Sequence, residues 1–415
     1  MRVSLPATGR AKDAILAEMR DMKAKDIDWQ HGRAPLFVFK ATDELSEVGR
    51  DAYFEFFTEN ALGAKRAFHS VNRMQDEVVA MALGLFNAPE TAQGFMTTGG
   101  TESIIQAMQA CRDLSRSQRK QPALRGNIVA AETLHPAFDK GGKLMDIEVR
   151  RAPMGADFRA DVSAMEELID DETIMLVGSA PCFPFGVIDP ISEIGKLAER
   201  RSLWLHVDAC VGGYLAPFAR MIGREIPEFD FNVSAVSSIS ADLHKFGFCP
   251  KPASTVFYRT PEQAAFHHFD FSNWPNGRFT TSTIVGTRPA GGVAAAWASF
   301  EFLGLEGYKQ IAVDLMSFVD AYKSGIAEID GLKIHGHPHL SIVAYGSDEV
   351  DVFRVAEIMS AKGWLPGLVQ KPKGIHRMMS MIHAPSLDEY LAEVRAAVGV
   401  ARQTGPEQST IKASY

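Results

Sequence analysis

The stretch SISADLHKFGF, residues 238–248, places a lysine, Lys245, between two apolar segments. The run FNVSAVSS (231–238) leads into it and the run STVFYR (254–259) follows it, and both have the composition of buried strands. A lysine in such surroundings is costly unless it is ion-paired, exposed to solvent or covalently occupied. The rest of the sequence has to explain why Lys245 is tolerated there.

Short apolar segments alternate with amphipathic segments along most of the chain. Strands are predicted at 127–132, 147–153, 173–181, 203–209, 233–240 and 254–259. Helices are predicted at 11–25, 76–86, 101–118, 136–145, 162–171 and 190–201. Thr101 is a candidate N-cap for the third helix, and Pro136 stands at the start of the fourth. This alternation predicts an α/β fold with a mostly parallel sheet.

The pattern changes beyond about residue 300. A long helix is predicted over 291–329, and shorter mixed segments follow it, as in a smaller α+β domain. We therefore divide the chain at three boundaries. The predicted parts are an N-terminal helical segment (1–60), a large α/β domain (61–300), a small C-terminal α+β domain (301–405) and a polar tail (406–415).

The composition favours a soluble globular protein in a reducing compartment. Of 415 residues, 46% are hydrophobic and 23% charged, and the net charge of −8 argues against a broad face for nucleic acid. The four cysteines are scattered without CxxC or short Cys/His spacing, so neither a metal site nor a disulfide framework is indicated. No stretch has the length of a signal peptide core or a transmembrane helix. We therefore expect a cytoplasmic location.

Two motifs stand where predicted strands give way to helices. In TTGGTES (97–103), two glycines and Thr101 offer backbone N–H groups and a hydroxyl to an anion, although a tight turn with an N-cap explains the same residues. In LHPAFDK (134–140), His135 has three possible roles: to cap the helix, to remain solvated or to stack on a flat ligand. Taken alone, neither motif identifies a ligand.

A third motif adds a carboxylate to the same edge of the sheet. Asp208 in LHVDACVGG (205–213) follows an apolar strand, and no Arg or Lys follows it before Arg220. A buried carboxylate needs a positive partner, and a protonated ring nitrogen would serve. A glycine-rich anion cup, this aspartate and Lys245 match the needs of pyridoxal phosphate: phosphate at the helix N-terminus, pyridinium N–H on Asp208 and aldehyde on the lysine.

Six motifs together resemble one known family, the sphingosine-1-phosphate lyases. They are MTTGGTESI (96–104), HPAFDKGG (135–142), FPFGVIDPISEIGKLA (183–198), LHVDACVGGYLAPFA (205–219), SISADLHKFGFCPK (238–251) and TSTIVGTRPAGG (281–292). That family consists of fold-type I pyridoxal-phosphate enzymes related to the group II amino-acid decarboxylases. The resemblance spans about residues 35–400. It implies a transferase-like large domain with a mostly parallel sheet.

The resemblance implies a catalytic role for three of these residues. Lys245 would carry the Schiff base, Asp208 would pair with the pyridinium nitrogen and His135 would stack on the cofactor ring. A base must also take the proton of the substrate's 3-hydroxyl group, and the sequence leaves it open among Lys245, His135, His206 and the phosphate group.

The resemblance also implies how the cofactor phosphate is held. Gly100, Thr101 and His244 would bind it within one subunit. Gly286 and Thr287 would reach it from the neighbouring subunit, which predicts a homodimer with shared active sites.

The residues expected near the substrate depart from the family pattern. Gly63, Ala64 and Lys65 stand where the family has a His-Pro-Asp-like segment, Phe39 replaces a tyrosine, and Phe185 turns an FPHG motif into FPFG. Lys65 and Arg66 could rebuild an anion site there. Lys251, six residues after Lys245, matches a family lysine that approaches the substrate's phosphate, but it is equally explained as an exposed loop lysine.

The resulting expectation is a pyridoxal-phosphate-dependent carbon–carbon lyase. It would cleave a phosphorylated, lipid-like amine by a retro-aldol reaction to a fatty aldehyde and phosphoethanolamine. The alternative is an amino-acid decarboxylase on the same fold, which would need an arginine for the substrate's carboxylate. A relative without activity that serves as a binding protein would not need Lys245, Asp208 and His135 together.

Overall fold

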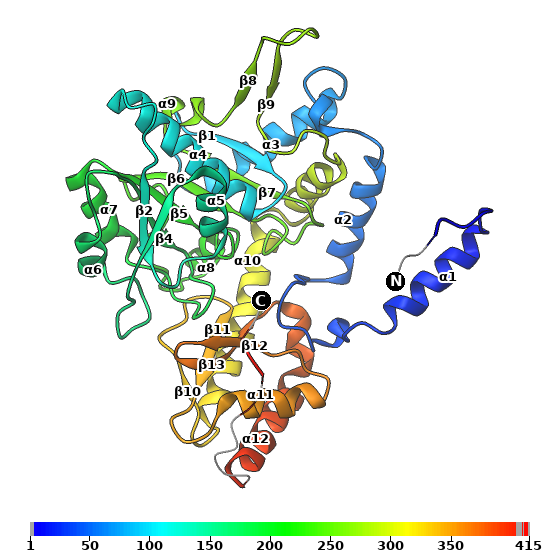
Figure 1. Ribbon diagram of the computed structural model, residues 1–415. Coiled ribbons are helices and arrows are strands. Elements are labelled where there is room, and N and C mark those ends of the chain that lie inside the picture. Colours follow the sequence, from blue (N-terminus) through cyan, green and yellow to red (C-terminus); the bar gives the residue numbers. More distant parts are fainter. Residues whose placement is uncertain (1–3, 404–408, 410, 414–415) are drawn as a thin grey trace.

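The computed structural model describes residues 4–403, 409 and 411–413. Its largest sheet has seven strands in the order β1-β7-β6-β5-β4-β2-β3 (Figure 1). The strands are β1 (Gln93–Thr97), β2 (Asn127–Ala131), β3 (Glu148–Ala152), β4 (Thr173–Ser179), β5 (Trp204–Asp208), β6 (Val236–Ala241) and β7 (Ser254–Tyr258). Only β7 runs antiparallel to its neighbours in this sheet. The mostly parallel sheet predicted from the sequence is confirmed.

Side chains alternate between the two faces of this sheet, and helices cover both faces. In β2, Ile128 and Ala130 belong to one apolar cluster, and Val129 and Ala131 belong to another. Strands buried on both faces read as continuous apolar runs, which is why the sequence showed them so clearly. The helices in this part of the chain are α3 (His69–Leu85), α4 (Gly100–Arg119), α5 (Ala137–Met145), α6 (Val162–Glu167), α7 (Ile191–Arg201), α8 (Ala216–Met221) and α9 (Pro261–Ala265).

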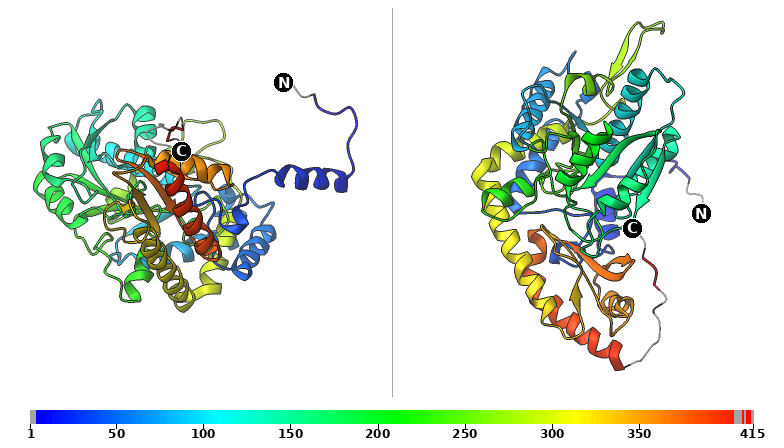
Figure 2. Two further views of the ribbon diagram at one scale, coloured as in Figure 1. Left: turned by 90° about the horizontal axis from the view of Figure 1, so that it is seen from below. Right: turned by 90° about the vertical axis from the view of Figure 1, so that its left-hand side faces the viewer.

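A second, four-stranded sheet lies in the C-terminal part of the chain (Figure 1). Its antiparallel strands are β10 (Lys333–Ile334), β11 (Ile342–Gly346), β12 (Gly367–Gln370) and β13 (Lys373–Met378), and its helices are α11 (Val352–Ala361) and α12 (Leu387–Gln403). The long helix α10 (Gly291–Ala327) runs from the large sheet to the small one and has non-helical backbone at Gly304 (Figure 2). The α+β character of this region is confirmed.

The predicted boundaries at residues 60, 300 and 405 stay a prediction. Helix α10 crosses residue 300 without leaving helical structure there. The predicted polar tail, 406–415, lies mostly outside the described residues, which include only 409 and 411–413 of it.

The first helix extends away from the rest of the chain. Helix α1 (Lys12–Lys23) has no buried residue, and the left view of Figure 2 shows it apart from the body. The predicted helix over 11–25 is therefore confirmed, but its apolar residues are exposed. None of the helices described has the length and apolar composition that crossing a bilayer requires.

Several elements were missed or misplaced by the sequence analysis. It did not predict α2 (Asp43–Glu55), β1, α12 or the hairpin of β8 (Phe269–Phe271) and β9 (Phe279–Thr281). Short 3₁₀ turns at Trp29–His31, Ala61–Gly63 and Met381–Ser386 were also missed. The expectation that Thr101 is the N-cap of α4 is wrong. The helix begins one residue earlier, at Gly100, and its N-cap is Gly99.

The turn after β4 depends on the glycine at position 186. Gly186 has φ of +71°, and a Cβ atom there would lie 2.0 Å from the backbone oxygen of Ile342 in β11. We expect Gly186→Ala to lower the free energy of unfolding by at least about 2 kcal/mol, because both the left-handed backbone and the close approach disfavour a side chain. Urea unfolding of the two proteins measures this difference.

Gly84→Ala is the matched control. Gly84 lies in α3, and a Cβ there would meet nothing within 4 Å. Alanine should raise the free energy of unfolding at this site by about 0.5–1 kcal/mol, because it is the better helix former. Equal effects of the two substitutions would contradict this account of the turn.

Candidate active site

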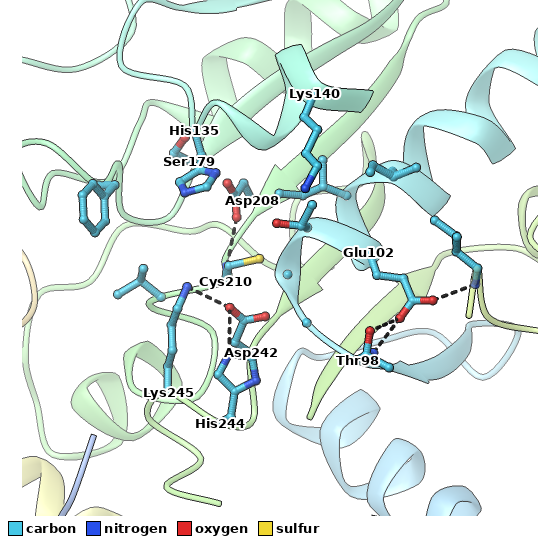
Figure 3. Close-up of a pocket in the computed structure, with 18 of the residues that line it drawn as sticks. Thr98, Glu102, His135, Lys140, Ser179, Asp208, Cys210, Asp242, His244 and Lys245 are labelled. Carbon is cyan, nitrogen blue, oxygen red and sulfur yellow. Dashed lines mark hydrogen bonds and ion pairs between the residues drawn. The ribbon is translucent and has the colours of Figure 1, made fainter. Parts of the chain in front are cut away.

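A cavity of about 540 Å³ opens at the carboxyl end of β5, beside the N-terminus of α4. Lys245, Asp208, His135, His244, Gly100 and Thr101 all line it, so the structure brings together six of the predicted site residues (Figure 3). Motifs that are up to about 145 positions apart in sequence meet here because parallel strands end at one edge of a sheet.

Lys245 is held by an ion pair that the sequence analysis did not predict. Its Nζ lies 2.7 Å from Oδ2 of Asp242, and the two side chains are 20% and 3% exposed. Burial alone would lower the pKa of Lys245, but the carboxylate of Asp242 outweighs burial and raises that pKa above its ordinary value. The amine is thus an ammonium ion when nothing is bound to it.

Asp242 is in turn fixed by a chain of buried hydroxyl groups. Its Oδ1 accepts a hydrogen bond of 2.5 Å from Ser254, whose Oγ lies 3.0 Å from that of Ser103. The hydroxyl of Ser103 lies 2.6 Å from that of Thr97 at the end of β1. Burial opposes the charge of Asp242, but Lys245 and His244 outweigh it and lower the pKa of this carboxyl. A buried network in which every member is satisfied fixes side chains in one arrangement.

Asp208 points into the cavity and is 7% exposed (Figure 3). Its Oδ1 accepts a hydrogen bond of 3.1 Å from the backbone N–H of Cys210. Among the ion pairs that the described residues form within 4 Å, none includes Asp208, but its charge acts on Lys245 and His135. A nearly buried carboxylate gains from a cation in direct contact, and a protonated ring nitrogen would supply one.

His135 and His206 differ in their access to the cavity. The ring of His135 lines it, and its Nδ1 accepts a hydrogen bond of 3.1 Å from the backbone N–H of Ala137. Burial lowers the pKa of His135, so its imidazole is neutral and carries the proton on Nε2. His206 is fully buried, and its two nitrogens contact the hydroxyls of Ser238 and Ser240 at 2.7 and 3.2 Å. His206 does not line the cavity.

The N-terminus of α4 forms a cup of bare backbone. A Cβ atom on Gly100 would lie 2.6 Å from the sulfur of Cys210 and 2.9 Å from both carboxylate oxygens of Asp242, so no larger residue fits. His244 closes the cup from the side, its Nδ1 accepting from the backbone N–H of Ala253 at 3.3 Å. A helix N-terminus with room for backbone approach is suited to an anion such as a phosphate group.

Gly286 and Thr287 do not reach this cavity in their own subunit. The hydroxyl of Thr287 accepts a hydrogen bond of 3.3 Å from Asn60. Instead, Ile284 and Val285 line the cavity, because their backbone N–H groups donate to Oε1 of Glu102 at 2.6 and 3.3 Å. The other oxygen of Glu102 accepts from Thr98 (Figure 3).

The remaining candidates lie outside the cavity. Lys251 is exposed, with Nζ 5.9 Å from the ring centroid of Phe39. Phe185 is buried and packs on Phe158. Lys65 and Arg66 are exposed. The expectation that these substrate-end residues border the site is not met within one subunit.

The sequence analysis missed several residues that do line the cavity. They are Thr98, Glu102, Lys140, Ser179, Phe183, Cys210 and Asp242. Two signals could have found some of them. Asp242 is three residues before Lys245, within reach of its side chain, and Glu102 directly follows the glycine motif.

Comparisons with known proteins agree with this geometry. The model of the pyridoxal-dependent decarboxylase conserved domain matches residues 66–347. The chain is 39% identical to the sphingosine-1-phosphate lyase of Oryza sativa subsp. japonica, over 96% of this chain and 74% of that protein. It is 40% identical to the Arabidopsis thaliana sphingosine-1-phosphate lyase, over 95% and 73% of the two chains. The chain belongs to the sphingosine-1-phosphate lyase family.

A solved structure supports the same assignment. The sphingosine-1-phosphate lyase of Burkholderia pseudomallei superposes with a TM-score of 0.93 at 31% identity, over 97% of this chain and 94% of that one. The protein is thus a pyridoxal-phosphate-dependent lyase of fold-type I, as the motifs predicted. The residues of the cavity fit the cofactor. Asp208 has no cation in direct contact among the described residues, the Gly100 cup suits a phosphate group, and Lys245 presents an amine in the same cavity.

Asp242→Asn should change how the lyase takes up its cofactor. The substitution keeps the shape of the side chain but removes the charge that holds Lys245 protonated. We expect the pH midpoint of cofactor capture by the apoprotein to fall by at least about one unit, because attack on an aldehyde requires the neutral amine. Absorbance after addition of pyridoxal phosphate, followed from about pH 6 to about pH 10, measures this midpoint.

Asp320→Asn serves as the control. Asp320 also contacts a lysine three residues later, Lys323, at 3.2 Å, but it lies in α10 outside the cavity. Its substitution should leave the midpoint unchanged. If Asp242→Asn also left it unchanged, the ion pair would not control the protonation of Lys245.

Proposed function

We propose that this protein cleaves a phosphorylated long-chain base, such as sphingosine 1-phosphate, by a retro-aldol reaction that gives a fatty aldehyde and phosphoethanolamine. The observation that carries the proposal is the placement of Lys245 and of the nearly buried carboxylate of Asp208 in one cavity beside an anion cup. Membership of the sphingosine-1-phosphate lyase family supports the choice of reaction.

Three residues would hold the cofactor ring, as the motifs predicted. Lys245 would attach it covalently, Asp208 would keep its ring nitrogen protonated, and His135 would stack on its face. When bound, pyridoxal phosphate supplies an electron sink for the bond that breaks. Gly100, Thr101 and His244 would hold its phosphate at the start of α4.

Among the histidines and lysines considered as the base, Lys245 is the best candidate. His206 is excluded by its position outside the cavity, with both nitrogens occupied by Ser238 and Ser240. His135 already uses Nδ1 as an acceptor, so its Nε2 can donate a proton but not accept one. Lys245 would act as this base only as a neutral amine. Asp242 would then stabilise the ammonium ion that forms when Lys245 takes the proton of the 3-hydroxyl.

The site lacks a feature that the decarboxylase alternative needs. No arginine is among the described side chains that line the cavity, and an arginine is the usual partner of a substrate carboxylate. Besides Lys245, the described side chains at the wall of the cavity include Lys140 of α5, which points into it (Figure 3). Lys251 stays a candidate for the substrate's phosphate.

We also propose that the protein is a homodimer in which Gly286 and Thr287 reach the neighbour's cofactor phosphate. Their segment is partly exposed and leads away from the cavity of its own subunit. Lys65 and Arg66 are exposed on the same chain and would be free to face a neighbour. The cysteines are all buried and free, which is compatible with the predicted cytoplasmic location.

A product assay tests the proposed reaction. We expect the holoenzyme to release a fatty aldehyde without CO₂ from sphingosine 1-phosphate or its saturated analogue, and to release no CO₂ from aromatic or acidic amino acids. Aldehyde trapping and CO₂ release are measured separately on the same samples. CO₂ without aldehyde would overturn the lyase in favour of a decarboxylase.

Mixing two inactive variants tests the shared site. Lys245→Ala removes the attachment point, and Gly286→Asp sets a negative charge against the neighbour's phosphate. A Cβ on Gly286 would meet nothing closer than 3.9 Å in its own subunit, so the second variant should fold. After the variants are mixed and allowed to exchange subunits, about a quarter of wild-type turnover should return, because half of the dimers then hold one intact site.

Each variant alone is the control for the other. Lys245→Ala should also lose the visible absorbance of the bound cofactor. Lys309→Ala, in α10 and outside the cavity, should keep both absorbance and turnover. Activity that never returns in the mixture, although subunit exchange is verified by a mass tag, would rule out sites shared between subunits.

A further inference from the structure

One arginine outside the cavity holds the segment that carries His135. Arg151 lies in β3, and its Nη1 donates to the backbone carbonyls of Glu132 at 3.1 Å and of Leu134 at 2.9 Å. Its Nη2 forms a hydrogen-bonded ion pair with the carboxylate of Asp139 in α5. The guanidinium group therefore contacts the chain on both sides of His135, at two carbonyls before it and at a carboxylate after it.

The segment between β2 and α5 needs such a contact. Strand β2 ends at Ala131 and α5 begins at Ala137, so His135 lies in neither a strand nor a helix. A guanidinium group presents its N–H donors in one rigid plane, so it can bind carbonyl and carboxylate oxygens at the same time. With both ends held by Arg151, the ring of His135 has a fixed place at the wall of the cavity.

The charge of Arg151 also acts on the imidazole. Burial is the main cause that lowers the pKa of His135. The carboxylates of Asp208 and Asp242 oppose this shift, whereas the cations Lys245 and Arg151 support it. A test of position must therefore keep the charge at residue 151 constant.

We propose that Arg151 is a positioning residue for His135, and that it keeps the imidazole where it would stack on the cofactor ring (Figure 3). The inference rests on the proposed function, because the stacking role of His135 belongs to that proposal. Arg151 is not among the described residues that line the cavity, so it acts through the segment that it holds.

Hydrogen exchange of the apoprotein tests the hold on this segment. Arg151→Lys keeps the positive charge, but its single nitrogen cannot take the positions of both Nη1 and Nη2. We expect the backbone amides of residues 132–139 to exchange about twofold to tenfold faster in this variant, as for the loss of one net hydrogen bond. Mass spectrometry of peptides from this segment measures the rates, and unchanged rates would overturn the proposal.

Arg150→Lys is the matched control. Arg150 is the neighbouring residue of β3, and its side chain is 26% exposed against 27% for Arg151. Successive residues of a strand point to opposite faces, and Arg150 contacts the carbonyl of Leu168 at 3.1 Å and the carboxylate of Asp170 at 2.6 Å. Its substitution should leave exchange in residues 132–139 unchanged. An equal acceleration in both variants would show a general weakening of β3, and the proposal would be wrong.

Cofactor affinity tests whether Arg151 acts through His135. The apoproteins are titrated with pyridoxal phosphate, and absorbance gives the Kd. His135→Ala should weaken binding, and Arg151→Lys alone should raise the Kd by about twofold to tenfold. Added to His135→Ala, Arg151→Lys should raise the Kd no further, because the ring that it positions is gone. Losses that multiply in the double variant would contradict the proposal.

Both measurements are made without substrate, so they separate this inference from the proposed reaction. If no substrate yields aldehyde but the two substitutions are non-additive in Kd, the reaction is wrong and the role of Arg151 stands. If aldehyde forms but Arg151→Lys changes neither exchange nor affinity, the reaction stands and Arg151 does not position His135.

Discussion

The ion pair between Lys245 and Asp242 is the constraint on which the site depends. A buried ammonium ion is tolerated only beside a fixed negative charge, and Asp242 is fixed by hydroxyl groups from β1, α4 and β7. The ion pair also stabilises the fold only over a defined range of pH. The raised pKa of Lys245 and the lowered pKa of Asp242 make its contribution to stability fullest between about pH 4 and pH 10, and it is lost outside that range.

Asp242 and Asp208, two carboxylates of the cavity, have different partners and different roles. Asp242 has its cation within the chain, whereas Asp208 has none among the described residues. Asp242 holds Lys245 in place, and Asp208 is left to bind a positive group of a ligand directly. An arrangement of this kind couples cofactor binding to folding, because the bound ring relieves a cost that the apoprotein carries.

The sequence predicted the cofactor end of the site well and the substrate end poorly, for a physical reason. Asp208 ends β5, and His135 and Lys245 come shortly after β2 and β6; these three strands are buried on both faces and are easily read. Gly100 was predicted from its glycine motif instead, because β1 is only partly buried and was missed. Phe39, Phe185 and Lys251 lie in loops whose course depends on tertiary contacts, and none of them lines the cavity. His206 was one of the candidate bases, but it lies deeper in β5, against serines of β6. The hairpin of β8 and β9 has short strands, and β8 is exposed throughout, so it left little apolar pattern to read.

Glu102 connects the phosphate cup of its own subunit with the loop that, in the proposed dimer, reaches the cofactor of the neighbouring subunit. One of its oxygens accepts from Thr98 beside the phosphate cup of its own subunit, and the other accepts from Ile284 and Val285, which lead to the loop offered to the neighbour. Ordering of the cup by one phosphate would therefore order the loop that completes the second cup. Loading of the two subunits would then be cooperative, with a Hill coefficient above one and half-loaded dimers rare at equilibrium.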